Sequence, residues 1–258
     1  MSNWKSNIIK GLKVLSIVFF GALFIVVLIA ASKSKDKILV SDIVVDIDAD
    51  ESGMYFLEEA DILDLITKKN TVVLINQTLE DIDLSDIEAT IKKHDFVENA
   101  EVFSNFDGKI KVKITQKRPQ YRIFNNKGVS YFISESGSYM PLSNKFTPRV
   151  IVATGKIPFE KQVAQEVLNS DLKKLIDFIQ EDEFLNAFIG SIHVDNDGEF
   201  ILIPKIMGHE IEFGGIEDLT EKFKRLKIFY KKALLFTEWE KYSVINLKYQ
   251  GQIICSKK

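Results

Sequence analysis

Cysteine is almost absent from this sequence, whose 258 residues contain only one, Cys255. An intrachain disulfide is therefore impossible, and small secreted folds that depend on disulfide bonds are excluded. Histidine is also scarce. The three histidines, His94, His193 and His209, show neither HxxH nor HExxH spacing and have no cysteine near them. Because a zinc site needs several convergent ligands, the sequence predicts no metal site.

Sequence motifs of catalysis are missing as well, since GxSxG, P-loop and GxGxxG patterns do not occur. Ser170-Asp171-Leu172-Lys173 matches the SxxK of penicillin-binding enzymes, but no SDN or KTG accompanies it. Asp195-Asn196-Asp197-Gly198 resembles part of a calcium loop, yet His193 and Pro204 occupy the positions that require an acid and a glutamate. We therefore predict a protein that is not an enzyme, without catalytic residues, cofactor-binding residues or a cofactor.

The charge balance shows no strong excess of either sign. The formal net charge is −3, which argues against a nucleic-acid binder, because such proteins normally carry a basic field. Hydrophobic residues make up 46% of the chain and charged residues 28%. These proportions are typical of a folded globular protein and exclude wholesale disorder.

One long apolar run stands near the N-terminus. Residues 14–31 contain no charge, and thirteen of these eighteen residues are Val, Leu, Ile or Phe. As a helix they span about 27 Å, close to the roughly 30 Å of a bilayer core. A cleaved signal peptide ending near Ala30-Ala31-Ser32 is the alternative, but the run exceeds the usual apolar region of such peptides. We expect a transmembrane helix at 14–31 and a short cytoplasmic tail at 1–13.

Residues 38–117 show the order β-α-α-β-β. A β-branched run at 43–47 predicts a strand, and 58–67 has the spacing of an amphipathic helix. Ser85-Asp86-Ile87-Glu88 has the form of a capping box that opens a second helix. Two strands follow, around a turn at 105–108. We therefore expect two helices packed on one face of a small sheet.

The second of these strands alternates most regularly. Ile110, Val112 and Ile114 alternate with a row of three lysines, so one face is buried and the other is basic. The lysine row consists of Lys109, Lys111 and Lys113. It is either a solvated face that discourages edge pairing or a docking surface for an acidic partner or anionic lipid.

Residues 118–258 contain many strands and two long helical segments. Hairpins are expected around 136–137 and 195–198, and helices at 159–180 and 216–239. Strands at 244–249 and 252–255 close the chain. The pattern predicts an α+β domain with a mostly antiparallel β-sheet.

Several segments, taken in order, resemble the bacterial cell-division protein family FtsQ, called DivIB in Gram-positive bacteria. They are Asp86–Ala89, Phe96–Val102, Gly108–Ile114, Lys117-Arg118-Pro119, Tyr131–Gly137 and Val244–Tyr249. Ser134 stands where the family usually has an acid, and Asn246 and Lys248 depart conservatively from its closing "V-D-L-R-Y" strand. The match covers nearly the whole chain, and its specificity comes from the order of the motifs.

The resemblance implies a POTRA domain and a β domain outside the inner membrane, carried by one transmembrane helix. It also implies a non-enzymatic divisome scaffold at the septum, which links early and late division proteins and recruits the FtsB–FtsL complex. Two alternatives remain: an outer-membrane assembly factor, which would need a membrane barrel downstream, and a membrane-anchored peptidoglycan enzyme.

The partner-binding residues are expected in the segment 244–249. Ile245 and Leu247 alternate there with residues of an accessible face, and the resemblance places a sheet edge at this segment. An edge strand offers unpaired backbone groups to a partner strand, here from FtsB. The candidate contact residues are Val244, Asn246, Lys248 and Tyr249, with Lys241 available to acids on the partner. Alternatively, the strand merely completes the core.

Overall fold

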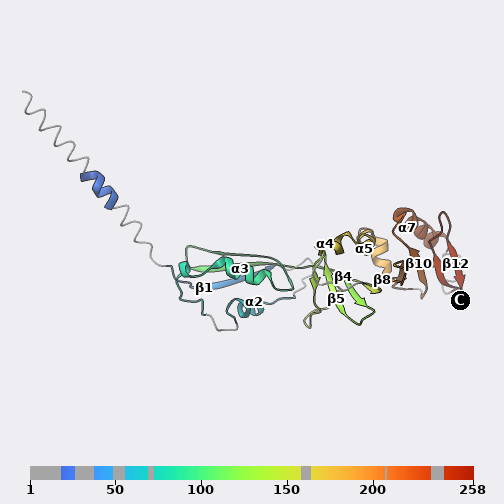
Figure 1. Cartoon of the computed structure of the whole chain (residues 1–258), viewed down its shortest axis with the longest axis horizontal. Helices are drawn as coiled ribbons and strands as arrows, with labels where there is room; N and C mark the ends of the chain where they lie inside the picture. Colours follow the sequence, from blue (N-terminus) through green and yellow to red (C-terminus); the bar gives the residue numbers. More distant parts are fainter. Residues whose placement is uncertain are drawn as a thin grey trace, which may run out of the picture.

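The computed structural model describes residues 19–26, 38–48, 56–68, 73–157, 164–206, 208–233 and 241–258. Two sheets follow one another along the long axis, and the C-terminus lies at the far end beside the last strand (Figure 1). The first sheet has three strands and the second has nine. The fold is thus mixed α+β, as expected.

Residues 19–26 are helical, and their apolar side chains are exposed. Most of the transmembrane helix expected at 14–31, and the whole of the tail at 1–13, lies outside the described residues. Within the described part of the chain, no helix is both long and apolar enough to cross a bilayer. The membrane anchor therefore stays a prediction.

The first sheet consists of β1 (Asp42–Asp48), β3 (Lys109–Gln116) and β2 (Val97–Ser104), in that order. β3 is central, parallel to β1 and antiparallel to β2. Helices α2 (Glu59–Ile66) and α3 (Leu84–Lys92) pack their buried residues against one face, and the 3-10 turn η1 (Leu79–Asp81) precedes α3. Val112 is fully buried in that core. The predicted β-α-α-β-β order and the inward face of β3 are confirmed.

The start of α3 differs from the prediction. Its N-cap is Asp83, whose carboxylate accepts hydrogen bonds from the backbone amides of Ser85 at 3.0 Å and Asp86 at 3.1 Å. The capping box at 85–88 is therefore wrong, because the helix has already begun at Leu84. Glu88 instead accepts hydrogen bonds from Lys92 and from the backbone amide of Val102 on the edge strand β2.

The lysine row lies on the central strand and not at an edge, which removes its expected role against edge pairing. In the strand register, Lys109 lies opposite Asp42, and Lys113 lies between Asp46 and Glu101. Opposite charges side by side on one sheet face stabilise each other. The open face of this sheet is thus a mixture of charges and not a purely basic surface.

The nine-stranded sheet has the order β12-β11-β10-β9-β8-β7-β4-β5-β6. Five neighbouring pairs are antiparallel and three are parallel, so the sheet is mostly antiparallel, as predicted. The strands are β4 (Pro119–Asn125), β5 (Ser130–Ser134), β6 (Tyr139–Met140), β7 (Ile151–Gly155), β8 (Ile189–Val194), β9 (Phe200–Pro204), β10 (Glu210–Gly214), β11 (Tyr242–Asn246) and β12 (Ile254–Lys257).

Helices cover one face of this sheet (Figure 1). They are α4 (Ala164–Asn169), α5 (Asp171–Gln180), α6 (Glu183–Phe188) and α7 (Leu219–Ile228), which continues into the π-helical turn η2 (Phe229–Ala233). The helix expected at 159–180 is interrupted at Ser170, which caps α5, and its first residues lie outside the described part. α7 begins at Leu219, three residues later than predicted, and the short helix α6 was not predicted.

An aromatic cluster joins the two sheets. Phe56 stacks on Phe96 and meets Phe146 edge-on, and this cluster includes the buried Phe132 and Met140 of the second sheet. Lys145 adds an ion pair with Asp61 at 2.6 Å and one with Glu58 at 3.4 Å. The two parts of the chain are thus in direct contact.

Candidate functional site

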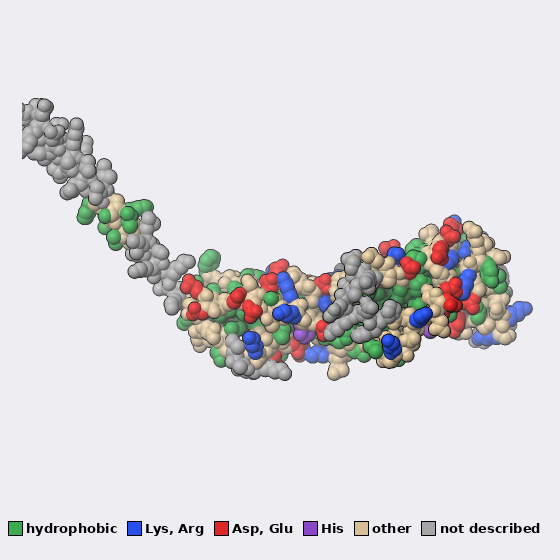
Figure 2. Space-filling view, viewed as in Figure 1, with side chains coloured by type: hydrophobic (Ala, Val, Ile, Leu, Met, Phe, Trp, Pro, Cys, Tyr) green, Lys and Arg blue, Asp and Glu red, His purple; other side chains and the backbone are tan. Residues whose placement is uncertain are grey.

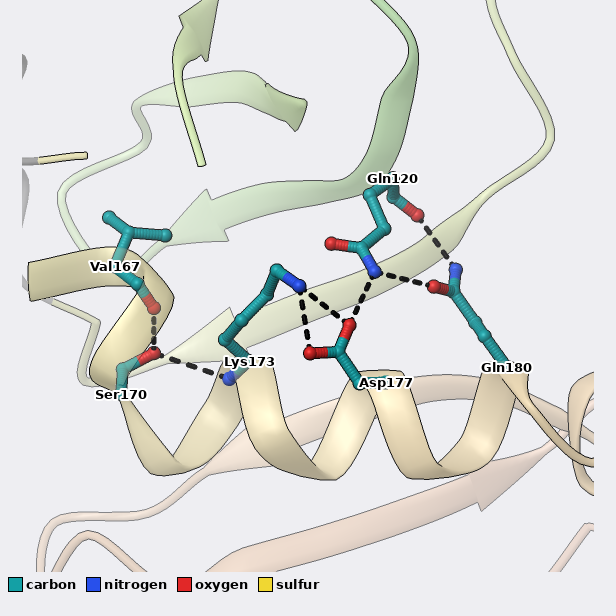
Figure 3. A network of polar contacts seen from close by, with 6 residues as sticks. All are labelled: Gln120, Val167, Ser170, Lys173, Asp177 and Gln180. Atoms are coloured by element: carbon teal, nitrogen blue, oxygen red, sulfur yellow. Dashed lines mark hydrogen bonds and ion pairs between the residues drawn. The ribbon is translucent and has the colours of Figure 1, made fainter. Parts of the chain in front are cut away.

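The SxxK match has a structural role in this fold. Ser170 Oγ accepts a hydrogen bond from the Lys173 backbone amide and donates one to the Val167 carbonyl (Figure 3). The Lys173 ammonium instead pairs with both carboxylate oxygens of Asp177, at 2.6 and 2.8 Å. Asp177 also accepts a hydrogen bond from Gln120 of β4, so this network fastens α5 to the sheet. The serine is a helix cap, and the lysine is engaged with an acid one turn further along.

Each of the three histidines has its own set of neighbours. His193 Nδ1 lies 3.0 Å from the hydroxyl of Thr154, and His209 is buried with its ring nitrogen against the Tyr230 hydroxyl. The His94 ring lies tilted against the Phe96 ring, with the ring centroids 5.8 Å apart. Among the described residues, no group of three or more His, Cys, Asp or Glu side chains could hold a metal ion.

The strand expected at the sheet edge is an internal strand. β11 pairs in parallel with β10 on one side and antiparallel with β12 on the other. The prediction that 244–249 forms the edge is therefore wrong, because β12 covers its outer side. The edge strand is β12, and within the described residues no strand pairs with its outer side.

The predicted contact residues lie one strand inward from this edge. Ile245 and Leu247 are fully buried, which confirms the predicted inner face. On the other face, Val244 lies opposite Ser256 of β12, and Asn246 donates a hydrogen bond to Glu212. The Lys248 ammonium pairs with Glu199, and that hydrogen bond raises the pKa of Lys248. Tyr249 is half exposed. Two of these polar side chains thus already have partners within the chain.

Arg225 holds the turn that connects β11 to β12. Its guanidinium lies on α7 and donates hydrogen bonds to the backbone carbonyls of Tyr249 and Gln252, both at 2.7 Å, and of Leu247 at 3.4 Å. One rigid planar group thus fixes three points of a six-residue turn. No sequence pattern predicts this role, because the acceptors are backbone groups 22 to 27 residues away.

The surroundings of β12 are basic. Lys257 and Lys258 end the chain, and the Lys258 backbone amide donates a hydrogen bond to the carbonyl of Lys241 at 3.0 Å. All three side chains are exposed, and lysine side chains are visible at this end of the molecule (Figure 2). Ile254 and Ser256 are exposed on the strand itself, whereas Cys255 packs against the core, where burial raises the pKa of its thiol. The edge therefore combines an outer side that no described strand covers with positive charge.

Comparison with known proteins identifies both parts of the chain. Residues 40–115 match the POTRA-like domain, and residues 118–256 match the family described as FtsQ/DivIB, C-terminal related. No curated protein matches the chain. The second match covers more than half of the sequence and includes the nine-stranded sheet except for Lys257 at the end of β12. The chain therefore belongs to the FtsQ/DivIB family and has a general role in cell division.

Proposed function

We propose that this protein is a non-enzymatic scaffold of the bacterial divisome, which links early and late division proteins and recruits the FtsB–FtsL complex to the septum. The family assignment supports a division role. The observation that carries the recruitment step is the outer side of β12, with which no described strand pairs, together with the exposed lysines beside it.

The scaffold is proposed to be a single-pass protein of the inner membrane. The apolar run at 14–31 is long enough to span the bilayer core as a helix. Three lysines lie on each side of it, at 5, 10 and 13 and at 33, 35 and 37, and the N-terminal amine on one side and Asp36 on the other favour a cytoplasmic N-terminus. Both folded parts would then lie in the periplasm, where the septal partners can reach them.

The partner is proposed to add a strand to the outer side of β12. Strand addition uses main-chain hydrogen bonds for affinity and side-chain contacts for specificity. Ile254 and Ser256 would contact alternate side chains of the partner strand, and Lys241, Lys257 and Lys258 would attract acids on it. Val244 and Asn246 would then contribute from β11, and Lys248 and Tyr249 from the turn that follows it, through parts of FtsB that extend across the sheet.

Site-specific photo-crosslinking in dividing cells tests this arrangement. A photoreactive residue at Ile254 or Ser256 of the full chain should capture FtsB, and one at Val244 or Asn246 should capture it more weakly. Thr154, on β7 in the middle of the sheet, is the control position and should capture none. Strong capture at Val244 but not at Ile254 would contradict strand addition at β12.

A second assay addresses the enzymatic alternative. The purified chain is expected to leave peptidoglycan intact, because its SxxK lysine is paired with Asp177. Release of soluble fragments from peptidoglycan, lost on Ser170→Ala substitution, would contradict the scaffold proposal.

A further inference from the structure

Exposed apolar side chains gather where the chain enters the POTRA-like domain. Phe106 is completely exposed, Leu39 is 51% exposed, and Ile38 and Ile75 are each more than a third exposed. We call these four residues the entry patch. Hydrophobic side chains are visible at the end of this domain to which the N-terminal segment connects (Figure 2).

Backbone contacts hold the entry patch together. The segment 38–40 pairs with 76–79, since the amide of Asn76 donates to the carbonyl of Val40 and the amide of Leu79 to that of Ile38. The hairpin turn that carries Phe106 packs on the same segment. Its Gly108 lies so close that a Cβ there would collide with the Leu39 carbonyl and would come within 3.4 Å of Ile38 Cγ2. The segments that carry the four exposed side chains are thus held next to one another by backbone contacts.

The turn itself is closed by hydrogen bonds, so Phe106 is presented at a fixed position. The amide of Asn105 donates to the Lys109 carbonyl at 2.9 Å, and the amide of Gly108 to the Asn105 carbonyl at 3.2 Å. Exposed apolar side chains on neighbouring segments mark an interaction site, whereas isolated exposed apolar residues are common.

We propose that the entry patch lies in the membrane interface, with Phe106 inserted among the lipids. This inference depends on the proposed anchor at 14–31. Six residues, 32–37, separate Ala31 from Ile38, and an extended chain over these seven Cα–Cα steps spans about 25 Å at most. The patch surrounds the point at which this short connection enters the domain.

The charges around the patch indicate how it binds. Asp42 and Asp107 border it, while Lys33, Lys35 and Lys37 precede it in the sequence. Because these charges largely offset one another, insertion depends on apolar contact and only weakly on anionic lipids. The expected partner is therefore the bilayer that holds the anchor, and added salt should change the contact little.

Fluorescence quenching by lipids tests the inference on the full chain. The only cysteine is removed by Cys255→Ser, and Phe106→Cys is then labelled with the environment-sensitive dye NBD. Phe124→Cys is the matched control, because Phe124 is 48% exposed on a strand of the second sheet. Each protein is reconstituted into phosphatidylethanolamine–phosphatidylglycerol vesicles, with and without doxyl-labelled lipid, and flotation is measured in parallel.

The expected result is that both proteins float with the vesicles, and that doxyl lipid removes most of the fluorescence at position 106 and little at position 124. Flotation with equal quenching at the two positions would overturn the inference and leave the anchor intact. If doxyl lipid does not quench NBD at position 106, and the NBD emission shifts to the blue only when a division protein is added, the inference is overturned and the patch binds a protein partner. Failure to float would refute the anchor and the inference with it.

Discussion

Replacing Arg225 with alanine should loosen the edge strand β12 while the rest of the domain stays folded. The substitution removes three hydrogen bonds from a charged donor to the carbonyls of Leu247, Tyr249 and Gln252. A hydrogen bond to a charged group contributes about 1.5–3 kcal/mol when well shielded. Two of these three are exposed, so water replaces part of the loss, and we expect about 1.5–3 kcal/mol in total.

Amide hydrogen exchange measures this effect directly at the edge. A loss of 1.5–3 kcal/mol corresponds to roughly a ten- to hundredfold faster exchange at residues 254–257. Exchange in β8, at the centre of the sheet, should not change. The exchange rate of Arg225→Lys at these residues should lie between those of the wild type and the alanine variant. A single ammonium group cannot reach all three carbonyls, as the planar guanidinium does.

Lys224→Ala is the matched control for this prediction. Lys224 is the preceding residue of α7, is exposed, and forms one long ion pair with Glu221 at 3.5 Å. The substitution Lys224→Ala removes a positive charge from the same helix and leaves the hydrogen bonds to the turn in place. Equal exchange rates in the two alanine variants would refute the view that Arg225 positions the edge strand.

Three further outcomes follow from the first domain. Val112→Asp should unfold it at a cost of about 3 kcal/mol or more, whereas Lys111→Asp on the opposite face should leave it folded, as measured by urea denaturation. Gln116→Leu should cost about 2–4 kcal/mol in the same assay, because the Gln116 side chain accepts hydrogen bonds from two buried backbone amides. The hydrogen bond from Lys92 lowers the pKa of Glu88 below 4.5, so its stabilisation is present above that pH and is lost as the pH falls further. Glu88→Gln should make stability less steeply dependent on pH between about 5 and 3; an unchanged slope would contradict this.

The periodic parts of the fold could be predicted from the sequence. The alternation in β3 is regular because one face contacts the helices and the other faces solvent. Apolar residues therefore mark the buried face, and polar residues mark the open face. The same reasoning gave the hairpins of the second sheet, where glycines with positive φ, such as Gly137 and Gly198, occupy the turns. These features depend on residues close together in the chain.

The wrong predictions concern helix boundaries, which the local sequence alone does not determine. Asp83 and Ser85 are both good N-cap residues two positions apart, and only the backbone path into α3 selects Asp83. The apolar residues at 159–180 keep helical spacing on both sides of Ser170, so the pattern predicts one continuous helix. It breaks there since the serine side chain caps the following turn.

The edge of the large sheet could not be predicted for a similar reason. Which strand is outermost depends on the parallel pairing of β11 with β10, which are separated by the whole of α7. β12 is four residues long and carries no clear alternation, so its sequence does not mark it as the edge. The candidate site is therefore β12, one strand further out than predicted. The hydrogen bonds from Arg225 to the turn between β11 and β12 can be recognised only in the folded structure.

Localisation of the partners in dividing cells tests the recruitment proposal most directly. The full chain carries Ile254→Lys and Ser256→Lys, because lysine on an edge strand discourages the pairing of a further strand. The control is Val152→Lys, on β7 in the middle of the sheet, and both variants are first shown to be folded and present in the membrane fraction. The account predicts that both variants reach the septum, and that labelled FtsB and FtsL are lost from it only with the β12 variant. Normal recruitment of FtsB and FtsL by the β12 variant would contradict it.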